Sequence, residues 1–260
     1  MKDTIIEALN LSGETLLNYF TKPIETKIKE SQSSIVTEAD FASDKLIKKI
    51  IIDKFPTHNI ISEESGFIKN NSEYTWVIDP LDGTSNFASG IPWFGVLIAV
   101  FKNEIPIMGG AYLPVDNVLY FAEYGKGAFR NETKLIMPEN SELMNSLISF
   151  SVDYTDDEIF LNRGMEIYRK IVQSCRNVRS TNSLVDFIYV AEGKFGGCIN
   201  MNTKIWDISA LGLIISEAGG KMTDINGNKL KFTLNKEIVE TNFSVIAGSQ
   251  KMIENIKYHL

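Results

Sequence analysis

The chain has 260 residues, of which 44% are hydrophobic and 23% charged, which is ordinary for a globular protein with a sizeable core. Its formal net charge of −7 argues against a nucleic-acid partner, because phosphate backbones attract basic patches. The two cysteines, Cys175 and Cys198, form no CxxC pair, which disfavours a disulfide framework and fits a reducing compartment.

The sequence favours a cytoplasmic protein without membrane contact. The first twenty residues carry Asp3, Glu7 and Glu14 among their apolar residues, so they lack the continuous apolar region of a signal peptide. The longest apolar run, IPWFGVLIAVF at 91–101, is shorter than a membrane-spanning helix requires.

The first half of the chain predicts two helices followed by strands. Apolar residues recur at roughly helical spacing over 5–20, and a second helix is expected after Thr37. Short β-like runs follow at 58–62, 74–79, 93–101, 105–113 and 117–124. Turn residues separate the last three runs, which indicates an antiparallel meander.

The second half alternates between the two kinds of element. Helices are expected at 156–174, 183–193 and 206–220, with a short strand at 195–200. A hairpin around Asn226 and Gly227, a strand at 243–248 and a final helix follow. This mixture predicts a layered α/β or α+β fold in a single domain over 1–260, with a subdomain seam near 138–146 as the best candidate boundary.

Several carboxylates stand where an apolar element meets a loop: Glu63, Glu64, Asp79, Asp82 and Asp207. Crowded carboxylates are costly unless a cation compensates their charge. Oxygen ligands favour Mg²⁺ or Mn²⁺ over zinc, and the sequence has no His or Cys cluster.

The stretch WVIDPLDGTSNF, from 76 to 87, suggests how such a site is built. Pro80 is expected to end strand pairing and fix a bend, so that Asp79 and Asp82 face one cavity with the Leu81 carbonyl between them. Gly83 allows close backbone approach. A helix that starts at Thr84 would aim free N–H groups at a phosphate oxygen.

Each of these features also has a simpler interpretation. Asp207 could be only a helix N-cap, and Thr37 with Asp40 only a variant capping box. The pair Glu63-Glu64 could be a solvated turn. Neither Ser183 nor Cys198 has a His–Asp set that would indicate nucleophilic catalysis. The hypothesis of a catalytic site therefore depends on the combination.

The combination resembles the inositol monophosphatase family, the magnesium-dependent, lithium-sensitive phosphatases. WVIDPLDGTSNF resembles the first signature of the family, and WDISALGLIISEAGG at 206–220 resembles the second. Further matches occur in the right order: VTEAD at 36–40, IISEESG at 60–66 and GKGAF at 125–129.

The resemblance implies a layered αβαβα sandwich, usually a homodimer, that hydrolyses a phosphate monoester by metal-activated water with two or three Mg²⁺ per site. By position, Glu63, Asp79 and the Leu81 carbonyl would hold the first metal, and Asp79, Asp82 and Asp207 the second. Glu63 would also help a third metal that positions the water.

The resemblance also assigns the remaining roles. Thr84, linked to Asp40, would orient the attacking water, and the backbone N–H groups of Gly83 and Thr84 would hold the phosphate. The substrate would contact four side chains, those of Asp82, Ser183, Asn200 and Asp207.

Three positions depart from the family pattern. Relatives often carry Gly-Ser/Thr-Ala where this chain has Thr181-Asn182-Ser183, and inositol phosphatases tend to have a glutamate in place of Asn200. Ser34 stands where some relatives carry an acidic residue near the third metal. The resemblance thus implies a polyol or sugar phosphate without specifying inositol.

Other functions of the same superfamily remain open: a 3′(2′),5′-bisphosphate nucleotidase, a fructose-1,6-bisphosphatase or a histidinol phosphatase. The first signature reads DGTSNF, closer to the inositol branch than to the DGTKEF of nucleotidases. Basic residues near the leaving-group pocket would favour a bisphosphate. A non-catalytic regulatory homologue is disfavoured by the intact metal-ligand set and by Thr84.

Overall fold

The computed structural model describes residues 1–22, 25–29, 35–139 and 142–259. Its helices are α1 (Lys2–Phe20), α2 (Glu38–Lys54), α3 (Thr84–Ala88), α4 (Glu158–Ser174), α5 (Leu184–Ala191), α6 (Ile205–Glu217) and α7 (Gln250–Tyr258), with 3₁₀ turns at Leu143–Asn145 and Lys236–Val239. None of these helices combines the length and the hydrophobicity that crossing a membrane requires.

The larger sheet has the strand order β10-β9-β8-β7-β6-β5-β3-β4. Its strands are β3 (Asn59–Ser62), β4 (Gly66–Ile68), β5 (Tyr74–Asp82), β6 (Gly95–Lys102), β7 (Ile105–Leu113), β8 (Val118–Glu123), β9 (Gly127–Arg130) and β10 (Thr133–Leu135). Pairing is antiparallel from β5 to β10, which confirms the predicted meander. Only the pair β3–β5 is parallel within the described part of this sheet.

The smaller sheet has the order β12-β11-β13-β15-β14. Its strands are β11 (Leu147–Ser151), β12 (Asn177–Arg179), β13 (Gly197–Thr203), β14 (Lys221–Asp224) and β15 (Phe243–Gly248). A separate ribbon pairs β1 (Lys27–Ile28) with β2 (Ile35–Val36).

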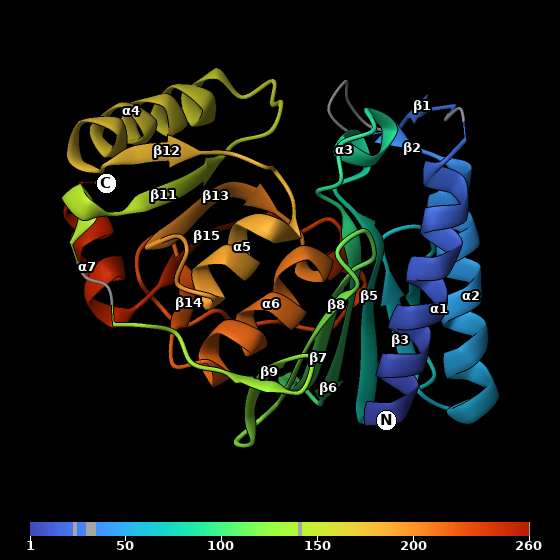
Figure 1. The fold of residues 1–260 in the computed structure, drawn as a ribbon. Coiled ribbons are helices and arrows are strands. Elements are labelled where there is room, and N and C mark those ends of the chain that lie inside the picture. Colours follow the sequence, from blue (N-terminus) through green and yellow to red (C-terminus); the bar gives the residue numbers. More distant parts are fainter. Residues whose placement is uncertain (23–24, 30–34, 140–141, 260) are drawn as a thin grey trace.

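Helices and sheets stack in the order helix, sheet, helix, sheet, helix (Figure 1). Helices α1 and α2 cover the outer face of the larger sheet, α5 and α6 lie between the two sheets, and α4 and α7 cover the outer face of the smaller sheet. The αβαβα sandwich expected from the family resemblance is therefore confirmed.

Strand β5 shows why the larger sheet is buried on both faces. Trp76 and Ile78 belong to the apolar cluster with Leu9 of α1 and Ile47 of α2, whereas Val77 belongs to the cluster around α5 and α6. Successive strand residues point to opposite faces, so a strand covered on both sides is a continuous apolar run.

The prediction that Pro80 ends strand pairing is wrong. Strand β5 continues to Asp82, which pairs with Gly95 of β6, and a register shift between Asp79 and Asp82 absorbs the interruption. A bulge accommodates a proline because the residue without an N–H leaves the regular ladder.

The predicted hairpin around Asn226 and Gly227 is reduced to a turn. The turn closes a single bridge between Thr223 and Lys229, and β14 pairs instead with β15, which lies further along the chain.

The chain passes from the larger to the smaller sheet between β10 and β11, where the subdomain seam at 138–146 is predicted. That seam stays a prediction, and its residues 140 and 141 lie outside the described ranges. Ser34, the position compared with relatives near the third metal, also lies outside them.

Candidate active site

Three carboxylates meet at one edge of the larger sheet. Asp79 and Asp82 of β5 and Asp207 of α6 each offer an oxygen, and these oxygens all lie within 4.8 Å of one another. Asp79 is 2% exposed and Asp82 8%. Such an all-oxygen set fits a hard divalent cation such as Mg²⁺ or Mn²⁺.

The bulge at the end of β5 sets the direction of the first two carboxylates. Asp79 Oδ1 accepts the Leu81 N–H at 3.1 Å, and Asp82 Oδ1 accepts the N–H of Leu184 at the start of α5. The hydroxyl of Ser43 on α2 donates to the Pro80 carbonyl at 2.7 Å. The strand end is thus held from both helical layers that flank it.

Asp207 is more than a helix cap. Helix α6 starts at Ile205 with Lys204 as N-cap, so Asp207 is the third helical residue, and its side chain accepts the N–H of the N-cap residue. Its Oδ2 accepts the Lys204 N–H and the Thr203 hydroxyl, both at 2.7 Å. Because a carboxylate has two oxygens, capping and cation binding are compatible, and the interpretation of Asp207 as the N-cap itself is wrong.

Glu63 reaches the cluster from the end of β3, which runs parallel to β5 and ends at the same edge. Its Oε1 accepts from the Lys29 ammonium at 2.9 Å, and Lys29 also pairs with Glu64, whose side chain is 3% exposed. The pair Glu63-Glu64 is therefore not a solvated turn. Lys29 was missed because a lysine just after the short β1 has no local pattern.

Thr84 lies between the strand end and α2. Its Oγ1 is 3.1 Å from Asp40 Oδ1 and 2.9 Å from the Leu81 carbonyl oxygen. Asp40 is fully buried, and its Oδ2 accepts the N–H and hydroxyl of Thr37 at 2.8 and 2.7 Å. The predicted capping box of Thr37 and Asp40 is confirmed, and the same carboxylate also contacts Thr84.

Gly83 connects β5 to α3 in a conformation that favours glycine. Its φ is +81°, and a Cβ added there would lie 2.6 Å from the Trp93 carbonyl oxygen and 3.1 Å from Ser183 Cβ. As the N-cap and first residue of α3, Gly83 and Thr84 have backbone N–H groups without intrahelical partners.

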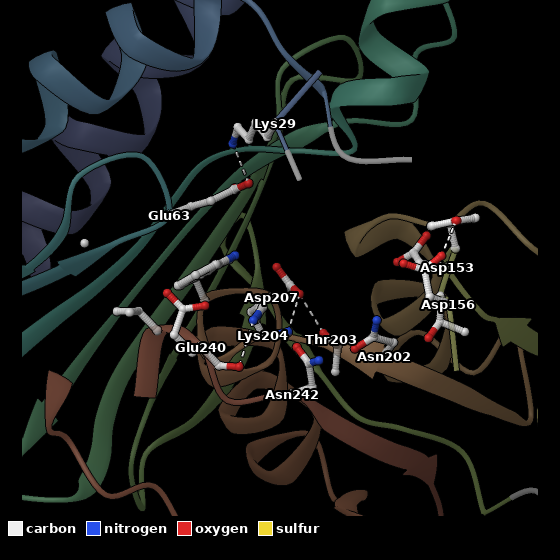
Figure 2. A pocket seen from close by; sticks show the side chains of 15 residues that line it. Lys29, Glu63, Asp153, Asp156, Asn202, Thr203, Lys204, Asp207, Glu240 and Asn242 are labelled. Carbon is white, nitrogen blue, oxygen red and sulfur yellow. Dashed lines mark hydrogen bonds and ion pairs between the residues drawn. The ribbon is translucent and has the colours of Figure 1, made fainter. Parts of the chain in front are cut away.

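The carboxylate cluster lines a cavity of about 150 Å³. It adjoins a larger cavity of about 540 Å³, whose lining residues Figure 2 shows. Every site residue predicted from the sequence except Asp40 lines the smaller cavity, including Ser183 and Asn200. The two cavities share the side chains of Glu63, Asp153, Asn202, Thr203 and Asp207. Several other polar residues on these walls were not predicted from the sequence: Lys29, Asp153, Asn202, Lys204 and Asn242.

A buried carboxylate fixes the loop in which the family glycine is missing. Asp186 is 2% exposed and accepts the N–H groups of Thr181 at 3.2 Å and Asn182 at 3.0 Å. Asn86 Nδ2 donates to the Thr181 carbonyl at 2.8 Å. Asn182 adopts φ +50°, a left-handed conformation that asparagine tolerates, so the loop turns there without glycine.

Burial and mutual repulsion make the cluster retain protons. Burial raises the pKa of Asp79 and of Asp82 well above the ordinary value, and neighbouring carboxylates raise it further. Burial also raises the pKa of Glu63 to about 7, against the opposing effect of Lys29. A bound cation would remove this repulsion, since it favours the charged form of each carboxylate.

We expect the metal-free protein to become more stable as the pH falls from 8 towards 5. These carboxyls have a higher pKa in the folded protein than in the unfolded chain, where it is about 4. The folded state therefore binds more protons between the two values, so acidification relieves the cost of crowding the charges. Thermal unfolding in EDTA at stepped pH measures this slope. Saturating Mg²⁺ should flatten it, and a melting temperature that falls steadily over this range would contradict the expectation.

Comparison with known proteins agrees with this geometry. The family model described as the inositol monophosphatase family matches residues 1–257. A fructose-1,6-bisphosphatase/inositol-1-monophosphatase of Aquifex aeolicus is 36% identical over 215 residues, covering 81% of this chain and 80% of the relative. A Nus factor SuhB of Pasteurella multocida is 33% identical over 231 residues, covering 87% and 86%.

A solved structure extends the likeness to three dimensions. The inositol monophosphatase from Anabaena (Nostoc) superposes with a TM-score of 0.82 at 30% identity, over 99% of this chain and 93% of that one. Both signatures, the αβαβα layers and the carboxylate cluster fall within the residues that the family model matches. The chain belongs to the inositol monophosphatase family.

Proposed function

We propose that this chain is a Mg²⁺-dependent phosphate monoesterase that hydrolyses the phosphate ester of a polyol or sugar. The observation that carries the proposal is the convergence of Asp79, Asp82 and Asp207 oxygens within 4.8 Å beside a polar cavity. A fold shared by many proteins does not fix an activity, whereas a cluster of buried carboxylates aimed into a cavity has a specific chemical use.

The metal ligands in this proposal come from three elements. Glu63, Asp79 and the Leu81 carbonyl would hold one Mg²⁺, and Asp79, Asp82 and Asp207 a second, with Mn²⁺ as a possible substitute. Bound Mg²⁺ would lower the pKa of water and stabilise negative charge on the phosphate oxygens.

The remaining residues would place the reactants. Thr84 Oγ1 donates its proton to Asp40 or to the Leu81 carbonyl, so its lone pairs can accept a hydrogen bond from the attacking water and fix its orientation. The backbone N–H groups of Gly83 and Thr84 would hold the phosphate at the start of α3. Ser183 and Asn200 can bond hydroxyl groups of the alcohol moiety.

Phosphate release from a panel of phosphate esters tests the proposal. The panel contains inositol 1-phosphate, fructose 1,6-bisphosphate, adenosine 3′,5′-bisphosphate and histidinol phosphate. We expect turnover with Mg²⁺, loss of turnover in EDTA and recovery on adding Mg²⁺ back, together with inhibition by lithium. Absence of metal-dependent turnover on the whole panel would refute an enzymatic role.

Two further properties belong to the same proposal. We infer a cytoplasmic location and a homodimer, and light scattering coupled to size exclusion would test the dimer. A second function is suggested by the relative named Nus factor SuhB, namely participation in a protein or nucleic-acid complex. The net charge of −7 favours a protein partner there, and such a role would survive loss of the carboxylate cluster.

A further inference from the structure

Lys204 is an ammonium group in the larger cavity that lacks a carboxylate partner. It lies between β13 and α6, is half-buried, and lines the cavity of about 540 Å³. Its Nζ donates to the backbone carbonyl oxygen of Glu240 at 3.1 Å. Across the described ranges of the chain, no carboxylate forms an ion pair with it. Lys29, on the same cavity, pairs with both Glu63 and Glu64.

Five carboxylates line this cavity, and within the described residues none forms an ion pair with Lys204, including that of Glu240, whose backbone carbonyl Lys204 contacts. Glu63 and Asp207 belong to the proposed metal ligands. Asp153 accepts from the Asn182 amide at 2.8 Å, and Asp156 from the Tyr154 hydroxyl. Figure 2 shows Asp153 and Asp156 on the side of the cavity away from Lys204, which lies beside Glu240 and Asn242.

The sizes of the two cavities indicate where the substrate would lie. The smaller cavity, about 150 Å³, is lined by the carboxylate cluster and has less than a third of the volume of the adjoining cavity of about 540 Å³. That volume suits a phosphate group and its ions. An alcohol moiety that contacts Ser183 and Asn200 in the smaller cavity would therefore extend into the adjoining cavity of about 540 Å³, which Lys204 lines.

An ammonium has three donors, and a half-buried one bonded to a neutral carbonyl retains most of its capacity for an anion. Hydrogen bonds between an ammonium and a carboxylate or phosphate are roughly twice as strong as neutral ones. These properties suit an anionic substituent better than a hydroxyl group.

We propose that Lys204 binds a second anionic group on the alcohol moiety of the substrate, either a phosphate or a carboxylate. The substrate is then a bisphosphate or the phosphate ester of a hydroxy acid, in preference to a neutral polyol phosphate. This inference rests on the proposed phosphatase function and narrows its substrate class.

The test compares Lys204→Met with Lys204→Arg and with wild type on three probes. Fructose 1,6-bisphosphate supplies a second phosphate, 2-phosphoglycerate a carboxylate, and inositol 1-phosphate a neutral alcohol. Wild type should prefer one anionic probe over the neutral one in kcat/KM. In Lys204→Met that preference should fall about 10- to 100-fold, mostly through KM, because a charge-assisted hydrogen bond is lost. Lys204→Arg should retain most of it.

Lys251→Met, which removes an exposed lysine on α7 far from the cavity, should leave the preference unchanged. An equal loss on all three probes would mean that Lys204 only offsets the charge of the carboxylate cluster, and would overturn the proposal. So would a wild type that favours the neutral probe.

Stabilisation of the Mg²⁺-loaded protein by the same probes gives a reading that needs no turnover. The anionic probe should raise the melting temperature of wild type more than inositol 1-phosphate does, and Lys204→Met should remove that difference. If this pattern occurs without hydrolysis of any probe, the phosphatase function fails while the anion subsite stands. Equal shifts in wild type and Lys204→Met would overturn the subsite.

Discussion

Asp82→Asn is expected to lose roughly 10³-fold or more in kcat/KM while the metal-free protein becomes more stable at pH 8. The asparagine is isosteric and keeps an oxygen that can accept the Leu184 N–H, so the connection to α5 survives. It removes one charged ligand from a site where electrostatic stabilisation supplies most of the rate, and single groups there contribute about 10²- to 10³-fold or more. Steady-state kinetics and thermal unfolding in EDTA measure the two effects.

The gain in stability would distinguish Asp82 as a metal ligand from Asp82 as a residue that only stabilises the fold. Removing one of several buried carboxylates that raise one another's pKa relieves repulsion in the empty site. Asp53→Asn, which replaces an exposed carboxylate paired with Lys49 on α2, is the matched control and should change neither quantity appreciably. An Asp82→Asn protein that is destabilised yet active would contradict the assignment of Asp82 as a metal ligand.

Gly83→Ala is the second change with a large expected effect. The alanine would adopt φ +81° at a cost of about 1–2 kcal/mol, and its Cβ would press on the Trp93 carbonyl oxygen at 2.6 Å. The backbone must move, and with it the N–H groups proposed to hold the phosphate. A displacement of about 1 Å at a reacting centre costs on the order of 10²-fold in rate. Urea unfolding and kcat/KM give the two numbers.

Gly90→Ala is the control for the free-energy cost of placing an alanine at a positive φ. Gly90 has φ +72° and nothing within 4 Å of an added Cβ, so it carries the conformational cost without the collision. We expect a loss of stability of about 1–2 kcal/mol from the backbone conformation alone and unchanged activity. If both variants lose activity equally, the contact of an added Cβ at Gly83 with the Trp93 carbonyl oxygen is not the cause of the loss.

The sequence was sufficient for the layers and for the carboxylate cluster because both depend on extended patterns. The alternation of elements predicted a layered α/β or α+β fold, and the family resemblance supplied the order αβαβα. The two signatures placed Asp79, Asp82 and Asp207 in one site although they lie far apart in the chain. The failed prediction at Pro80 has a physical reason. Whether a proline ends a strand depends on the register of the partner, here β6, which the local sequence does not contain.

The residues that were missed depend on long-range placement. Lys29 follows the two-residue strand β1 and contacts Glu63 only because the folded chain brings them together. The sequence predicts that Asp186 lies within a helix, and nothing in the pattern shows that its carboxylate also accepts the N–H groups of Thr181 and Asn182. Neither shows a periodicity, a motif or a spacing that predicts its partner.

The site is divided between the two halves of the chain. The groups proposed to cut the ester, Asp40, Glu63, Asp79, Asp82 and Thr84, precede the crossing to the smaller sheet. The polar walls of the larger cavity follow that crossing, apart from Lys29, Glu63 and Gly66. Asp207 alone of the proposed metal ligands comes from the second half. Mutations in the loops of the smaller sheet could therefore exchange one leaving group for another during evolution while the bond-breaking half stays intact, which gives this architecture a modular route to new substrates.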